Sequence, residues 1–133
     1  VYAHCIYLDA QDRDLMAQTD AAAAICPTSN AFLGSGFFDF SAGKSHDMAM
    51  GLASDVGGGT SMNVFRTMRA AYETARVDLP NQGRAATTLS PSYLWWLHTA
   101  GAARALDLAG VVGNLQPGCE ADFVVINPKA TPM

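Results

Sequence analysis

The segment Met48–Ser61 reads MAMGLASDVGGGTS and contains the features that decide the fold. Its apolar half, Met48–Ala53, predicts a short buried strand, and the glycines at 57–59 indicate an irregular turn after it. Asp55 follows the strand closely, in the position where α/β folds carry their reacting groups. One interpretation of Asp55 is a metal ligand or general base, and the other is a solvated turn residue that caps the next helix. The spacing alone leaves both open.

Two more apolar runs precede this strand. Val1–Tyr7 predicts the end of a buried strand, and Ala21–Cys26 predicts a second buried strand. Between them we expect a helix over about Ala10–Asp20, capped by Asp9. His4 lies near the end of the first strand, where it is either a hydrogen-bonded core histidine or a functional group.

The clearest helical pattern comes after the glycines, with a cap at Thr60 or Ser61 and an end before Pro80. Its apolar residues recur at spacings of three and four and are predicted to share one face: Met62, Phe65, Met68, Tyr72, Ala75 and Leu79. After a polar linker at 81–89, a serine cap followed by proline predicts another helix over about 90–108. Thr28–Asn30 predicts a polar turn, and glycines at 34, 36 and 43 indicate an irregular segment.

The order of strand, helix, strand, loop, strand, helix, helix predicts an α/β fold with parallel strands joined by crossovers. The pattern changes near Gly110, because Val111–Gln116 and Ala121–Ile126 predict two β segments around a turn. Two segments are too few for an independent β domain. We therefore expect residues 1–109 to form the α/β part and residues 110–133 to begin a β module.

The composition excludes several classes of protein. Half of the 133 residues are hydrophobic, which is incompatible with intrinsic disorder. A net charge of −4 without a basic run argues against nucleic acid as a partner. No apolar stretch reaches the roughly 18 residues of a membrane span, so we expect no membrane association. Only 15% of the residues are charged, which indicates a fragment or subunit that buries some faces against something else.

The three cysteines and the remaining two histidines carry little signal. Cys5, Cys26 and Cys119 are widely spaced and lack zinc-site spacing, so we expect small reduced side chains in a cytoplasmic protein. His46 lies in a polar loop and is predicted to be exposed. His98 lies beside two tryptophans and is predicted to be structural.

Several motifs, in order along nearly the whole chain, resemble the C-terminal half of the guanine deaminases of the amidohydrolase superfamily. The run of serine and glycine after the second strand, together with DVGGGTS, points to guanine deaminases in particular, whereas the last motif indicates only the superfamily. Ser54 departs from the usual threonine and His98 from a small residue. The matching segments are Ala3–Leu8, Cys26–Asn30, Phe32–Phe38, Gly51–Ser61, Phe65–Met68, Gly101–Leu106, Gly113–Gly118 and Glu120–Val125.

The resemblance implies the C-terminal part of a (β/α)8 TIM-type barrel, with about strands 6–8 in residues 1–109, and the start of a β-sandwich domain in residues 110–133. It also implies a mononuclear zinc site. In such enzymes a His-x-His pair from the first strand and a histidine from the fifth bind zinc, and a fifth-strand glutamate shuttles protons. By this resemblance Asp55 is metal ligand and general base, and His4 holds the attacking water or the substrate. The implied reaction deaminates guanine to xanthine and ammonia.

Two other classes stay open. One is another mononuclear amidohydrolase, either chlorohydrolase-like or a deaminase of an adenosyl compound. The other is a truncated half-barrel without catalytic function. The other zinc ligands of the family are absent from these 133 residues, so we expect this chain alone neither to bind zinc tightly nor to deaminate. We expect a small purine substrate, and either a homo-oligomer or association with a chain that carries the missing N-terminal half.

Overall fold

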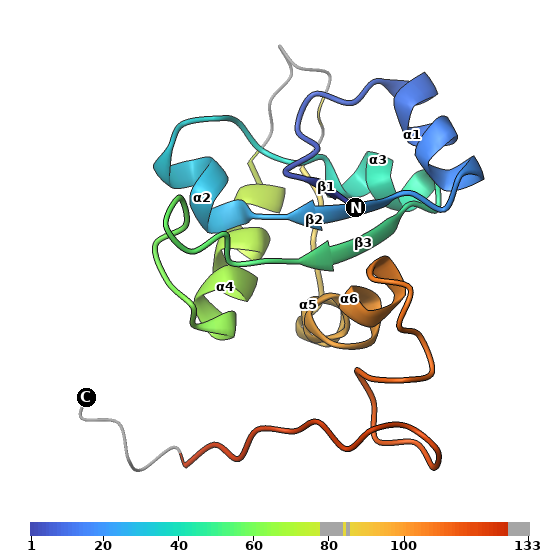
Figure 1. Ribbon diagram of the computed structural model, residues 1–133. Helices are drawn as coiled ribbons and strands as arrows, with labels where there is room; N and C mark the ends of the chain where they lie inside the picture. Colours follow the sequence, from blue (N-terminus) through green and yellow to red (C-terminus); the bar gives the residue numbers. More distant parts are fainter. Residues whose placement is uncertain (78–83, 85, 128–133) are drawn as a thin grey trace.

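The structure, a computed structural model, describes residues 1–77, 84 and 86–127. Three short parallel strands form the centre, and helices lie around them (Figure 1). The elements are β1 (Tyr2–Ala3), α1 (Ala10–Gln18), β2 (Ala22–Ile25), α2 (Pro27–Phe32), α3 (Phe40–Ser45), β3 (Ala49–Leu52), α4 (Val64–Ala75), α5 (Pro91–His98) and α6 (Ala100–Ala105).

The sheet has the order β1-β2-β3, and both pairings are parallel, as the alternation of elements predicts. The central strand β2 is largely buried, in agreement with its apolar sequence. The expectation of burial for the first strand is wrong, because Tyr2 in β1 is 64% exposed. β1 is an outer strand with one neighbour in the described sheet, so one of its edges and much of its side-chain surface face solvent.

One face of the sheet contributes apolar side chains to the core. Residues paired in register share a face, so Ala23 and Ile25 of β2 lie on the same side as Met50 and Leu52 of β3. Helices α1 and α5 add further core residues, and α6 packs against β3. The core consists of Met16, Ala23, Ile25, Phe38, Phe40, Met48, Met50, Leu52, Ala71, Ala75, Leu89, Leu94 and Leu97.

The predicted turn at Thr28–Asn30 is wrong, because these residues belong to helix α2. Pro27 occupies the first turn of α2, where its fixed φ suits a helix start. The three polar residues are all buried, so tertiary packing overrides their weak helix propensity. The irregular segment is also partly helical, since Asp39 caps α3 by accepting a hydrogen bond from the Ala42 backbone N–H at 2.9 Å.

Helix α4 differs from its prediction in both cap and face. Its N-cap is Asn63, two or three residues beyond the predicted cap. The buried residues are Thr67, Ala71 and Ala75, whereas Phe65 and Tyr72 are exposed. Helix α2 packs against α4, and small side chains suit a close approach between helices. Leu79, Pro80 and positions 81–83 and 85 of the predicted linker lie outside the described residues.

The predicted helix over 90–108 is divided into α5 and α6 at Thr99, whose φ of −121° and ψ of −100° are not helical. The Ser90 cap is present, and its side chain accepts from the Tyr93 backbone N–H at 3.2 Å. Gly101 packs so closely on Trp96 that a Cβ there would lie 2.8 Å from the indole ring. The lack of a side chain at Gly101 therefore permits this close approach of α6 to α5 beside the break.

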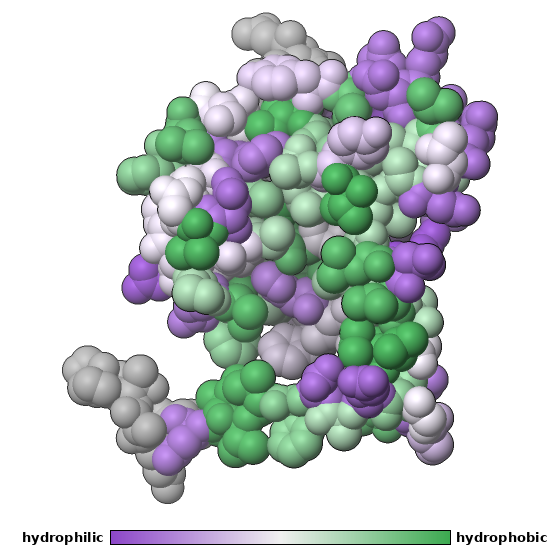
Figure 2. All heavy atoms as spheres, viewed as in Figure 1, coloured by the Kyte–Doolittle hydropathy of each residue, from purple (hydrophilic) through white to green (hydrophobic). Residues whose placement is uncertain are grey.

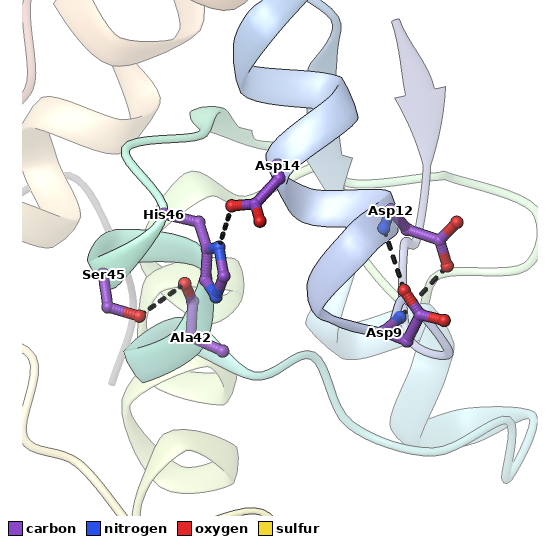
Figure 3. A network of polar contacts seen from close by, with 6 residues as sticks. All are labelled: Asp9, Asp12, Asp14, Ala42, Ser45 and His46. Atoms are coloured by element: carbon purple, nitrogen blue, oxygen red, sulfur yellow. Dashed lines mark hydrogen bonds and ion pairs between the residues drawn. The ribbon is translucent and has the colours of Figure 1, made fainter.

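Helix α1 begins as predicted, and its polar residues tie it to α3 (Figure 3). Asp9 and Asp12 form a reciprocal capping box at its N-terminus. Further along, His46 Nδ1 lies 2.6 Å from an Asp14 carboxylate oxygen. The prediction that His46 is exposed is therefore wrong in part, because its side chain is 24% exposed and paired.

The two β segments predicted after Gly110 are not strands in the described part of the tail. A single isolated bridge joins Ala109 and Val112. Phe123 and Val125 are 70% and 85% exposed, and the apolar tail lies open along the lower edge of the molecule in Figure 2. A strand needs a neighbour to pair with, and no described residue pairs in this way with residues 121–126. The β-sandwich therefore stays a prediction. None of the described helices has the length and apolarity to span a membrane.

The contact between β3 and α6 yields a prediction about stability. A Cβ at Gly51 would lie 3.0 Å from the Ala102 Cα atom, which is backbone and cannot rotate away. We expect Gly51→Val to lower the free energy of unfolding by about 1–3 kcal/mol through overpacking. Urea unfolding of the native polypeptide that carries these residues measures the change. The control Ala31→Val also introduces a valine, at an exposed helix position, and equal losses in both variants would contradict the prediction.

Candidate functional site

His4 and Asp55 meet at the carboxyl end of the sheet. β1 ends one residue before His4, and β3 ends three residues before Asp55. Because the strands are parallel, both ends reach the same edge, and His4 Nε2 lies 3.8 Å from Asp55 Oδ2. The two side chains are 38% and 40% exposed. The structure therefore places the two predicted site residues side by side, accessible from solvent.

The backbone of these residues has an uncommon conformation. His4, Cys5 and Asp55 have φ values of 65°, 51° and 46°, in the left-handed region that few non-glycine residues adopt. His4 still donates its backbone N–H to Ala24 of β2 at 2.8 Å, so the sheet holds this strained residue in place. Backbone strain of this kind clusters at functional sites.

Helix α2, which follows β2, supplies a third polar residue to the site. Asn30 in α2 is buried, and its Oδ1 lies 2.8 Å from His4 Nδ1. The sequence alone does not single out Asn30, because Thr28–Asn30 is predicted to form a polar turn. The one signal for this region in the sequence is the resemblance of the segment Cys26–Asn30 to guanine deaminases.

Cys26 lies close to the same pair. The thiol of Cys26, a nitrogen of His4 and a carboxylate oxygen of Asp55 all lie within 4.8 Å of one another. Imidazole, carboxylate and thiolate are the usual donors to zinc, so this donor set fits the metal that the resemblance implies. Burial raises the pKa of the Cys26 thiol, and the negative charge of Asp55 raises it further. Cys26 would have to lose its thiol proton before it could bind a metal, whereas Asp55 and His4 carry no thiol.

The glycine turn after β3 packs tightly against Asp55. A Cβ at Gly58 would lie 2.9 Å from Asp55 Oδ2 and 3.0 Å from Ser29 Oγ. Any other residue at position 58 would push against the carboxylate or the serine. A glycine at this position therefore allows the turn to cover Asp55 without displacing it.

The remaining histidine and cysteine residues considered from the sequence show no sign of a catalytic role in the described structure. His98 ends α5, and burial lowers its pKa, in agreement with a structural side chain. Cys5, Cys26 and Cys119 are all free. Ser29 Oγ and Asn30 Nδ2 are buried polar atoms for which the described residues offer no hydrogen-bond partner.

Comparison with known proteins agrees with this arrangement. The model of the Amidohydrolase family matches residues 1–133. The chain belongs to the amidohydrolase family. It is 38% identical over its full length to the guanine deaminase of Escherichia coli and 35% identical over 98% of its length to that of Homo sapiens. The chain spans 29% of the length of each of these relatives.

Solved structures of amidohydrolases have the same fold. The Escherichia coli guanine deaminase superposes with a TM-score of 0.83 at 39% identity, over 98% of this chain and 29% of that one. A zinc-bound adenosine deaminase from Xanthomonas campestris superposes with a TM-score of 0.78 at 25% identity, over 90% of this chain and 27% of that one. The resemblance to guanine deaminases and the α/β class of the fold are thereby confirmed.

The environment of Cys26 predicts slow thiol chemistry. Cys26 is 3% exposed, and its raised pKa leaves little thiolate at neutral pH, since the thiolate is lost as the pH falls below the pKa. We expect iodoacetamide at pH 7.5 to label Cys26 at least about tenfold more slowly than the partly exposed Cys119. Peptide mass spectrometry measures both rates in one sample.

Urea serves as the control for this experiment, because unfolding exposes both thiols and should make their labelling rates similar. Labelling of native Cys26 at the rate of Cys119 would contradict the buried position of Cys26.

Proposed function

We propose that this chain forms part of the catalytic barrel of a guanine deaminase, a zinc-dependent aminohydrolase that converts guanine and water to xanthine and ammonia. The observation that carries the proposal is the approach of His4 Nε2 to Asp55 Oδ2 at the carboxyl ends of parallel strands. The guanine deaminases among its relatives support the substrate. The proposal concerns the whole protein, because the guanine deaminase relatives are more than three times as long as this chain.

In this proposal Asp55 holds the zinc ion together with ligands that these 133 residues do not supply. Zinc, when bound, lowers the pKa of a water ligand toward about 7 and thus makes hydroxide available at neutral pH. The Asp55 carboxylate accepts a proton from the attacking water and later delivers a proton to the leaving amine. His4 orients the water or the substrate and stabilises charge that develops on oxygen.

The open edges of the sheet suggest how the chain fits into a larger fold. β1 and β3 are the outer strands of the described sheet, and exposed Tyr2 marks the free side of β1. In this proposal further barrel strands pair with both edges, either from the same polypeptide or from an associated one. Residues 1–109 then form strands 6–8 of the barrel, and residues 110–133 lead into a β-sandwich.

A second substrate class has support from one relative. A 5-methylthioadenosine/S-adenosylhomocysteine deaminase from Nitratidesulfovibrio vulgaris is 30% identical over 98% of this chain. This relative favours a deaminase of an adenosyl compound as the alternative. Assays with guanine and with 5-methylthioadenosine, followed by release of ammonia, distinguish the two.

Removal of the Asp55 carboxylate tests the proposed role directly. We expect Asp55→Asn in the native polypeptide to lower kcat/KM for guanine by about 10²–10⁴-fold, because an amide cannot act as the base. Metal analysis should also show less bound zinc. The matched control is Asp14→Asn, which removes a carboxylate that pairs with His46 away from the strand ends. Wild-type turnover in Asp55→Asn would contradict the proposal.

The isolated chain gives a separate prediction. His4, Cys26 and Asp55 are the only clustered metal donors among the residues the structure describes, and they lie at an open edge of the sheet. A catalytic zinc site uses about three protein ligands and a water, and of the three donors here the Cys26 thiol keeps its proton at neutral pH because its pKa is raised. We expect a titration of residues 1–133 with zinc to show no micromolar binding and no turnover of guanine. Micromolar binding accompanied by turnover would refute this expectation.

A further inference from the structure

The hydrogen bond between His4 and Asn30 determines which nitrogen of the His4 ring carries a proton. Asn30 Oδ1 lies 2.8 Å from His4 Nδ1, within normal hydrogen-bond distance. An amide oxygen only accepts, so the ring nitrogen that faces it must donate. A neutral imidazole has one N–H group. With that proton on Nδ1, Nε2 presents a lone pair.

The distance on the other side of the ring agrees with this assignment. Nε2 faces Asp55 Oδ2 at 3.8 Å, which is longer than a hydrogen bond. An N–H group at Nε2 aimed at a carboxylate would approach to about 2.7–2.9 Å. Two acceptor atoms 3.8 Å apart can both accept from a single donor group that lies beside them. A water molecule about to lose its proton is such a donor.

Asn30 is suited to fix the ring because its own position is fixed. Its side chain is buried, with 1% of the residue exposed. Its backbone N–H donates to Cys26 at 2.9 Å, and its carbonyl accepts from Ser35 at 3.0 Å. The His4 side chain, by contrast, is 38% exposed and would otherwise be able to rotate.

We propose that Asn30 is a positioning residue, which holds His4 as the Nδ1–H tautomer and aims the Nε2 lone pair at the attacking water beside Asp55. The proposal rests on the deaminase function proposed above. Asn30 acts through His4 and does not touch the reacting atoms. If the Asn30 amide were reversed, its NH₂ group would donate to Nδ1, and the proton of His4 would move to Nε2.

NMR of the native polypeptide with ¹⁵N-labelled histidine tests the tautomer. The His4 signals are assigned by their loss in His4→Gln. We expect Nδ1 to be protonated and Nε2 to be unprotonated in the wild type. A proton on Nε2 in the wild type would overturn the proposal. This measurement needs no substitution at Asn30, so it decides the question even if an Asn30 variant fails to fold.

Substitutions at Asn30 then test the consequence. Asn30→Leu keeps the branched shape and removes the acceptor, so we expect the tautomer preference to be lost and kcat to fall about 10- to 100-fold with a smaller change in KM. Asn30→Asp keeps an oxygen at the same place, and we expect it to retain the Nδ1–H tautomer and most of kcat.

Thr28→Val is the matched control in the same helix. The Thr28 hydroxyl is buried and has no hydrogen-bond partner among the described residues, so its removal should leave the tautomer and kcat unchanged. An Asn30→Leu variant with wild-type tautomer and kcat would overturn the proposal. A wild type that shows the Nδ1–H tautomer but does not turn over guanine would contradict the proposed function and leave the positioning of His4 by Asn30 intact.

Discussion

The parallel pairing of three short strands is the constraint on which the site depends, because it brings their carboxyl ends to a single edge. The central strand β2 acts as the template on both sides. Its Ala24 carbonyl accepts from the His4 backbone at 2.8 Å, and its Ile25 carbonyl accepts from Ala53 at 2.9 Å. These two hydrogen bonds therefore fix where the backbone at His4 and at Ala53 lies relative to the end of β2. A shift of one residue in either pairing would turn the side chains that follow to the opposite face.

The polar residues at this edge are supported from below by buried structure. β2 and α2 are among the most buried parts of the molecule, and Asn30 of α2 is buried while its side chain contacts His4 of the site. Positive φ angles at His4, Cys5 and Asp55 are unfavourable by about 1 kcal/mol or more each. Packing and backbone hydrogen bonds of β2 offset that cost. The site thus combines a strained backbone and half-exposed side chains with the buried structure of β2 and α2. This arrangement suits precise orientation of a small substrate.

The relation of the chain to its relatives explains features that are unusual for an independent domain. It has few charged residues, an exposed outer strand and an apolar extended tail. Each of these is expected where further strands and helices of a larger fold cover the surface. The family relationship and the superposition on guanine deaminases support the same view, since the chain matches 29% of their length.

Much of the fold could be predicted from local sequence. The apolar runs located β2 and β3, and Asp9 and Ser90 located two helix starts, because these signals depend on neighbours along the chain. The α2 helix could not be predicted, since buried Thr28 and Asn30 form a helix against their own weak propensity. The buried face of α4 was predicted only in part, at Met68 and Ala75, because it depends on which helix packs against it.

For the site, the order of residues predicts that His4 and Asp55 follow strand ends, and hence that both lie at the same edge if the strands are parallel. Only the tertiary structure decided their separation, the left-handed backbone that orients them, and the contact of His4 with Asn30. The physical reason is that these features arise between residues 26 to 51 positions apart in the chain. Such contacts are set by strand pairing and helix packing, and no local pattern of residues encodes them.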